Sequence, residues 1–204
     1  QMNGQELAAF NRAYTGPRPD IFQLIPLEAR QILDIGCGTG ALSETIKQRQ
    51  SAHVVGMELV PEMAAEAQRK LDQVIVGNLD ELDVVDALAG RQFDCIICGD
   101  VLEHLKDPWT TLSILSSHLT DNGVVVCSLP NIRHISTFIS VFLFGYWPYR
   151  DRGIHDRTHL RFFTWRNIKE LFQGSQLTID KVQRNYRIIE RPHRFNVIAP
   201  IFAL

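Results

Sequence analysis

The sequence predicts an α/β fold in which helices cover both faces of a doubly wound, mostly parallel β-sheet. Apolar runs of strand length alternate along the chain with longer segments of helical periodicity. A glycine-rich turn follows the first of these runs. Parallel strands that are buried on both faces have this continuous apolar character. A length of 204 residues with 45% hydrophobic composition suits one domain, so we expect a single unit over residues 1–204.

Five apolar runs are expected to form the strands, over residues 31–36, 53–58, 73–78, 93–100 and 124–130. Helices are expected between them, over residues 41–48, 61–71 and 109–119. Pro61 suits a first helical turn, and Asp121-Asn122-Gly123 is typical of a turn into the fifth strand. Before the first strand, a short helix over residues 6–14 and a stiff link over residues 17–19 are expected within an N-terminal cover of residues 1–30.

The regular alternation ends after Pro130. Apolar side chains then recur at spacings of three and four over residues 132–144, which predicts an amphipathic helix. Its apolar face is too wide to leave in water, so we expect residues 131–162 to form an insertion whose helix is a lid or, through residues 132–147, a homodimer contact. The stretch is broken by polar residues and too short for a bilayer span, and no membrane span is expected.

A helix capped by Thr164 and ending near Gln173 is expected next, followed by an alternating strand over residues 177–189. The chain carries 21 basic and 23 acidic residues without a long basic run, which argues against nucleic acid as a partner. No signal-peptide pattern opens it, so we expect a cytoplasmic protein. Cys95 and Cys98 form a CxxC inside a strand-like run, where buried core thiols are favoured over a redox pair or a zinc half-site.

The strongest local signal is the loop Asp34-Ile-Gly-Cys-Gly-Thr-Gly40. Glycine lets the backbone turn tightly and lets a ligand approach the peptide groups. Loops of this kind border the ligand crevice at the carboxyl ends of the strands in open α/β sheets. Glu58 ends the second strand, where a carboxylate can accept hydrogen bonds from both hydroxyls of a ribose. The alternative is a tight turn with an unrelated surface glutamate.

The same loop fits the looser dinucleotide fingerprint, because Gly36, Gly38 and Ala41 match GxGxxG/A. An NAD-type oxidoreductase is therefore an alternative of a different enzyme class. An oxidoreductase of this type also needs a second nucleotide-binding half and a substrate domain. The residues that remain in the chain are too few for both, which disfavours the oxidoreductase.

Four segments in order, DIGCGTG, VVGMELVPEMA, FDCIICGDVLEHLKDPW and HDRTHLRFFTWRNIKELF, make the chain resemble the class I methyltransferases that use S-adenosylmethionine (SAM). The resemblance is to the bacterial branch associated with glycan and cell-surface biosynthesis. It implies a Rossmann-like fold, SAM as cofactor with S-adenosylhomocysteine as product, and transfer of a methyl group to a hydroxyl of a small or sugar-like acceptor. A non-catalytic SAM-binding module is the remaining alternative.

The resemblance also implies a cofactor site. The loop residues would surround the amino-acid end of SAM. Glu58 would bind the ribose, and the residues beside the second and third strands would flank the adenine. The end of the fourth strand would line the methionine side, and two residues before the first strand would cover the cofactor. Relatives usually carry Asp where this chain has Asn78, although an Asn carbonyl can also accept the adenine bond. The implied residues are Tyr14, Arg18, Asp34, Gly36, Cys37, Gly38, Gly40, Met57, Glu58, Leu59, Asn78, Leu79, Asp100, Val101 and Leu102.

The acceptor side is expected from four residues that combine imidazoles with a carboxylate. A hydroxyl acceptor needs a base, and imidazole has a suitable pKa near neutrality. The candidates are His104, His155, Asp156 and His159, the last three on the predicted insertion. A structural polar network is the alternative for the insertion residues. His155 and His159 would bind a metal only if helical, and since no third ligand is evident we expect no metal site.

The resemblance bears finally on the C-terminus. Relatives follow the strand at residues 177–189 with one that inserts beside strand five, for which only residues 196–204 remain here. Pro200 would remove a ladder donor from a strand between two neighbours. We therefore expect this stretch not to pair inside the sheet, and part of the closing hairpin to be absent.

Overall fold

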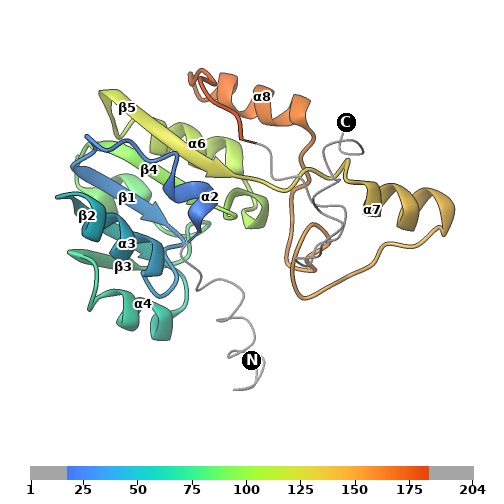
Figure 1. Cartoon of the computed structure of the whole chain (residues 1–204), viewed down its shortest axis with the longest axis horizontal. Coiled ribbons are helices and arrows are strands. Elements are labelled where there is room, and N and C mark those ends of the chain that lie inside the picture. Colours follow the sequence, from blue (N-terminus) through green and yellow to red (C-terminus); the bar gives the residue numbers. More distant parts are fainter. Residues whose placement is uncertain (1–17, 184–204) are drawn as a thin grey trace.

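The protein is described by a computed structural model over residues 18–183. Its centre is a five-stranded, entirely parallel sheet in the order β3-β2-β1-β4-β5, with helices on both sides (Figure 1). The predicted fold class is confirmed. The strands are β1 (Gln31–Ile35), β2 (His53–Glu58), β3 (Gln73–Val76), β4 (Phe93–Gly99) and β5 (Leu119–Ser128).

The fifth strand begins earlier than the sequence predicts. Leu119 already pairs with Phe93, whereas the next paired residue, Val124, lies opposite Cys95. Four residues of β5 therefore face a single residue of β4, and the predicted turn at Asp121-Asn122-Gly123 is a bulge inside the strand. At Gly123 a Cβ would lie 2.8 Å from the Phe93 carbonyl oxygen, so only glycine fits the bulge.

The predicted helices form with small changes at their ends, as α3 (Ala41–Arg49), α4 (Pro61–Ala67), α6 (Pro108–Ser116) and α8 (Trp165–Gly174). Pro61 and Pro108 occupy first turns, and the side chain of Thr164 caps α8 by accepting a hydrogen bond from Asn167 N. The sequence analysis missed α2 (Pro19–Phe22), α5 (Val84–Leu88) and the 3₁₀ turn η1 (Leu102–His104). These are single turns, too short for a helical period to show.

Two apolar cores lie on opposite faces of the sheet. Alternate residues of β4 divide between them, with Cys95 and Ile97 in one core and Ile96 and Cys98 in the other. The first core is closed by α2, α3 and residues around α4, and the second by α5, α6 and α8. Cys95 and Cys98 are buried free thiols, as predicted, and burial raises the pKa of Cys95 to about 12. This division is what a doubly wound sheet requires.

The segment after β5 is helical as predicted, in two short pieces, α7 (Ile135–Thr137) and the π-helix η2 (Phe138–Leu143). Its position differs from the prediction. The helix stands away from the sheet instead of covering the strand ends (Figure 1). Phe142 and Leu143 are 74% and 65% exposed, so the packed lid expected from the sequence is wrong for this structure. The predicted homodimer contact stays a prediction.

The elements predicted at the two ends of the chain lie wholly or partly outside the described residues. Residues 177–183 form no strand, so the predicted strand is absent over its described part. Tyr14, the helix at residues 6–14 and the stretch 196–204 lie outside the described residues, and the predictions on them stay untested. Within residues 18–183, no helix is both long and apolar enough to cross a membrane.

Arg49 in α3 holds the turn at α2 against the sheet. Its guanidinium donates to the carbonyls of Phe22 and Ile25 at 3.0 Å and lies 4.2 Å from the centre of the Phe22 ring. Ile21 and Ile25 on this turn are buried in the core, and Arg18 precedes it. The position of Arg18 at the strand ends therefore depends on Arg49.

We predict that Arg49→Met destabilises the protein by about 1–3 kcal/mol, because it removes the charged hydrogen bonds to the carbonyls of Phe22 and Ile25 as well as those to Gln50 Oε1. Hydrogen exchange should accelerate most at residues 21–25. The matched control is Arg69→Met, at an exposed arginine after α4. Equal exchange at residues 21–25 in both variants would contradict the assigned role.

Candidate functional site

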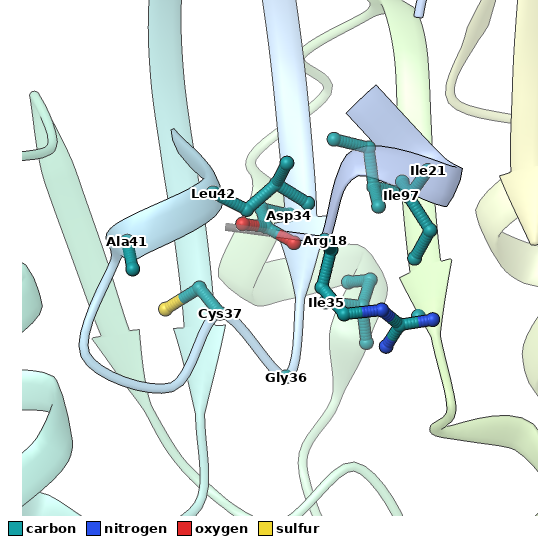
Figure 2. Close-up of a pocket in the computed structure, with 10 residues that line it drawn as sticks. Arg18, Ile21, Asp34, Ile35, Gly36, Cys37, Ala41, Leu42 and Ile97 are labelled. Carbon is teal, nitrogen blue, oxygen red and sulfur yellow. The ribbon is translucent and has the colours of Figure 1, made fainter. Parts of the chain in front are cut away.

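The candidate site lies where β1 and β4 pair in the middle of the sheet. The chain leaves β1 toward one edge and β4 toward the other, so the loops after these strands diverge and leave a crevice. A pocket opens there, and Figure 2 shows the residues around it. It is lined by Arg18, Ile21, Asp34, Ile35, Gly36, Cys37, Ala41, Leu42, Ile97 and Gly99.

Three glycines shape the loop after β1. Gly36, Gly38 and Gly40 all have positive φ angles, of 67°, 57° and 75°. A Cβ on Gly36 would lie 2.7 Å from a methyl group of Val101, and one on Gly40 would lie 2.6 Å from a methyl group of Leu71. Both the backbone conformation and the space therefore require glycine. Residues 37–40 of the loop are buried, and the backbone N–H groups of Gly36 and Cys37 donate to the carbonyl of Met57. Gly36 is the exposed residue of the loop and lies at the strand ends, where it lines the pocket.

Glu58 at the end of β2 holds this loop in place. Its Oε2 accepts a hydrogen bond from Gly38 N at 2.8 Å, and its Oε1 accepts one from Val60 N at 2.9 Å. The predicted alternative of an unrelated surface glutamate is wrong, because the side chain is buried against the loop. Each carboxylate oxygen has a second lone pair, so Glu58 can still accept hydrogen bonds from two hydroxyls.

Asp34 is a buried carboxylate facing the pocket. It is 3% exposed and accepts a hydrogen bond from Ser43 Oγ at 2.6 Å. Burial, together with the nearby charge of Glu58, raises the pKa of Asp34 from its ordinary 3.8 to about 6, although the hydrogen bond from Ser43 acts in the opposite direction. Such a group is costly to keep ionised near neutral pH, which is typical of a binding or catalytic site.

Arg18 and Asp100 form an ion pair across the crevice, with Arg18 Nη1 2.7 Å from Asp100 Oδ2. Ser128 Oγ donates to the other oxygen of Asp100 at 2.5 Å. Arg18 and Asp100 both have positive φ angles, 43° and 58°, which are unfavourable for residues other than glycine. Strained residues of this kind cluster at functional sites.

The residues predicted to flank an adenine separate into two groups. Met57 is 2% exposed and belongs to the core, so its side chain does not reach the surface of the site. Leu59 is 60% exposed, and Leu79 is partly buried beside the core. Asn78 Oδ1 accepts a hydrogen bond from Asp80 N at 3.1 Å, which fixes its amide. Leu59, Asn78 and Leu79 are therefore less buried than Met57, and the adenine site that they would form stays a prediction.

The residues predicted to line the site after β4 also differ in burial. Leu102 is fully buried in the core and supports the site from behind, whereas Cys37 on the opposite loop is 8% exposed and lines the pocket. Val101 is partly buried and packs over Gly36. Asp100 therefore supplies the polar group at this point, with Val101 as an apolar wall.

The predicted acceptor residues are brought together only in part. His104 and His159 stand edge to face, with ring centres 4.7 Å apart. Burial and the neighbouring His104 lower the pKa of His159, which favours its neutral form. Beside them lies Glu103, which the sequence analysis missed although it precedes His104. Glu103 is 1% exposed, and burial raises its pKa well above the ordinary value, with Asp100 adding to the effect.

His155 and Asp156 make contacts within the insertion, and the catalytic role expected for them stays a prediction. His155 is fully buried, bonds Thr137 Oγ1 at 3.0 Å through Nε2, and meets the Trp147 ring. Asp156 accepts two hydrogen bonds from Thr158, and although burial opposes them, these bonds lower its pKa. Residues 155–159 are not helical, so His155 and His159 do not form the i, i+4 metal pair considered above.

The residues present fit a SAM-type cofactor. The glycine loop runs close to Val101 and Leu71, where a Cβ at Gly36 or Gly40 would clash, and Gly36 and Cys37 of this loop line the pocket. The carboxylates of Asp34 and Glu58, which stand beside this loop, suit an ammonium group and ribose hydroxyls respectively.

We predict that Asp34→Asn stabilises the protein at pH 7. The folded pKa lies above the unfolded one, so the folded state binds more protons and stability falls as pH rises from about 4 to about 6. A shift of this size corresponds to about 2–3 kcal/mol above pH 6. Denaturant unfolding of both proteins between pH 4 and 8 should show the decline in the wild type and a flatter profile in the variant. Parallel profiles would contradict the prediction.

Comparisons with known proteins agree with this geometry. The methyltransferase domain family matches residues 9–182. A ubiquinone biosynthesis O-methyltransferase of Cereibacter sphaeroides is 30% identical over 185 residues, covering 88% of this chain and 70% of that protein. Another protein of that name from Azorhizobium caulinodans is 33% identical over 144 residues, 67% of this chain and 54% of the relative. These relatives do not belong to the glycan branch that the motifs suggested.

A solved SAM-dependent methyltransferase of Archaeoglobus fulgidus has the same fold. Its TM-score is 0.62 at 21% identity, over 83% of this chain and 73% of that one. The family match spans both the glycine loop and the cluster beside β4, so it covers the whole candidate site. The chain belongs to the methyltransferase domain family and is a class I methyltransferase whose cofactor is SAM.

Proposed function

We propose that this enzyme transfers the methyl group of SAM to a hydroxyl of a small quinone precursor. The observation that carries the proposal is the pair His104 and His159, in which an imidazole from the turn after β4 meets one from the insertion. The relatives are named for O-methylation in ubiquinone biosynthesis, which supports a hydroxyl of this class. SAM supplies an activated methyl group, and the chain must bind it, orient an acceptor and accept or direct a proton.

On the cofactor side, we assign the peptide groups of the glycine loop and Asp34 to the amino-acid end of SAM. Glu58 takes the ribose, and Leu59, Asn78 and Leu79 flank the adenine. Arg18 and Asp100 close the methionine side through their ion pair. Met57 and Leu102 support these groups from the core, and Cys37 lines the pocket.

On the acceptor side, His104 and His159 face the hydroxyl. A neutral imidazole is needed to take a proton, and burial keeps His159 neutral near pH 7. His155 and Asp156 act as positioning residues, because they hold the segment that carries His159. We further propose that residues 131–162 are the acceptor insertion of a single domain.

A methyl-transfer assay with labelled SAM tests the proposal. The panel contains dihydroxy- and methoxyhydroxybenzene derivatives with alkyl chains, nucleotide sugars, and a blank without acceptor. We expect a methyl ether on a phenolic hydroxyl and none on a sugar. Transfer to a sugar alone would replace the quinone-precursor acceptor, and SAM binding without any transfer would favour a non-catalytic module. Thermal protection by NAD in place of SAM would support the oxidoreductase.

We predict that Glu58→Ala weakens binding of S-adenosylhomocysteine by roughly 1.5–3 kcal/mol, about 10- to 150-fold. The variant loses the ribose acceptors and the bond that holds Gly38 N. Isothermal titration calorimetry measures the change. Glu62→Ala, at an exposed position in α4, is the matched control and should bind normally. Unchanged affinity in Glu58→Ala would reject the ribose assignment.

A further inference from the structure

Three metal-ligating side chains converge beside the proposed acceptor position. One ligand atom each from Glu103, His104 and His159 lies within 4.8 Å of the other two. Glu103 and His104 come from η1 directly after β4, whereas His159 comes from the distant insertion. The backbone carbonyl of Glu103 accepts hydrogen bonds from Leu160 N and Arg161 N, at 2.8 and 2.9 Å. The fold itself therefore holds the two segments together.

The hydrogen bonds of the two imidazoles leave one nitrogen of each available to a metal. His159 Nδ1 lies 3.3 Å from the carbonyl of Ile154, and His104 Nδ1 lies 3.3 Å from the carbonyl of Thr158. A carbonyl only accepts, so both Nδ1 atoms carry the proton and both Nε2 atoms have free lone pairs. Backbone partners on the second nitrogen are the usual means of orienting a histidine ligand.

Asp156 supports His104 indirectly, through Thr158. Thr158 Oγ1 donates to Asp156 Oδ1 at 2.6 Å and also contacts His104 Nδ1 at 3.1 Å. Thr158 is thus held by a carboxylate on one side and by an imidazole on the other. The arrangement fixes the orientation of the His104 ring relative to His159.

Glu103 is the independent sign that a ligand belongs here. Its side chain is 1% exposed, and its Oε2 accepts no hydrogen bond from the part of the chain that the structure describes. Its other oxygen lies 4.0 Å from His159 Nε2. A buried carboxylate without a donor is costly, and a bound cation removes that cost.

We propose that Glu103, His104 and His159 bind one divalent transition-metal cation. Two imidazoles and one carboxylate are a donor set that first-row metals such as Zn²⁺, Co²⁺ and Mn²⁺ accept. Ligand atoms about 2.0–2.2 Å from an ion stand roughly 3–3.5 Å apart, so small side-chain rotations complete the site. The sequence analysis considered His155 with His159 as the metal pair and expected no metal because no third ligand was evident; it did not consider Glu103 or His104 as ligands.

The cation would act on the acceptor. A metal-bound hydroxyl loses its proton far more readily than a free one, so the ion would orient the acceptor oxygen and make it nucleophilic near pH 7. This role rests on the proposed function, whereas the binding site itself does not. An imidazole that binds the ion cannot also take the proton. With the ion bound, His104 and His159 therefore place the ion, and the proton of the bound hydroxyl passes to solvent in place of the transfer to imidazole described above.

Cobalt binding to the chelator-treated full chain tests the site without any acceptor. We expect one Co²⁺ per chain, visible absorption bands typical of a low-coordinate site, and a Tm raised by about 5 °C or more when Co²⁺ is a hundredfold above Kd. Glu103→Gln and His159→Ala should each weaken binding at least about 10-fold. The matched control is His53→Ala, at an exposed histidine that begins β2 and so lies at the amino ends of the strands, away from the cluster.

Binding of S-adenosylhomocysteine checks that each variant is folded, because none of the three ligands belongs to the cofactor side. Equal Co²⁺ affinity in the wild type and Glu103→Gln, or no binding at all, would overturn the site. Cobalt binding with methyl transfer that survives chelation would overturn the role assigned to the ion. Failure of every acceptor in the presence of bound Co²⁺ would instead count against the proposed function.

Discussion

The rest of the site depends on the pairing of β1 with β4. This pair is where the strand order reverses, so the chain departs from it in two directions and leaves the carboxyl ends of both strands uncovered. The glycine loop follows one strand, and Asp100 and Glu103 follow the other. Arg18 reaches Asp100 across the gap. Every group assigned to the cofactor or the acceptor is positioned relative to this pair.

The protein gives up stability at this edge. Asp34 is a buried carboxylate with a raised pKa, Glu103 is another without a hydrogen-bond donor to one oxygen, and Arg18 and Asp100 have strained backbones. None of these features helps the fold, since neutral or apolar residues of similar size would cost less. Two apolar cores on opposite faces of the sheet offset them. Their concentration at one edge is itself evidence that the edge is functional.

The insertion after β5 combines two unlike parts. The residues next to His159 are tied to Glu103, after β4, by backbone hydrogen bonds, and the buried His155 bonds Thr137 at the base of the helix. The helix formed by α7 and η2 carries an exposed apolar face, with the rings of Phe138 and Phe142 stacked on each other. The first part therefore belongs to the site. The second keeps its amphipathic pattern without a partner in the chain that the structure describes.

The sequence by itself determined the strands, most helices and the cofactor loop, because apolar period and glycine spacing are local properties. It identified Glu58, and also His104 and His159 as candidates. Only the tertiary structure decided that Met57 and Leu102 lie in the core, and that His155 contacts Thr137 whereas His159 contacts His104. It also decided that Glu103 joins the two imidazoles. The contact between the two segments joins residues more than fifty positions apart in the chain. A local pattern in a single sequence does not predict which distant segments will be in contact.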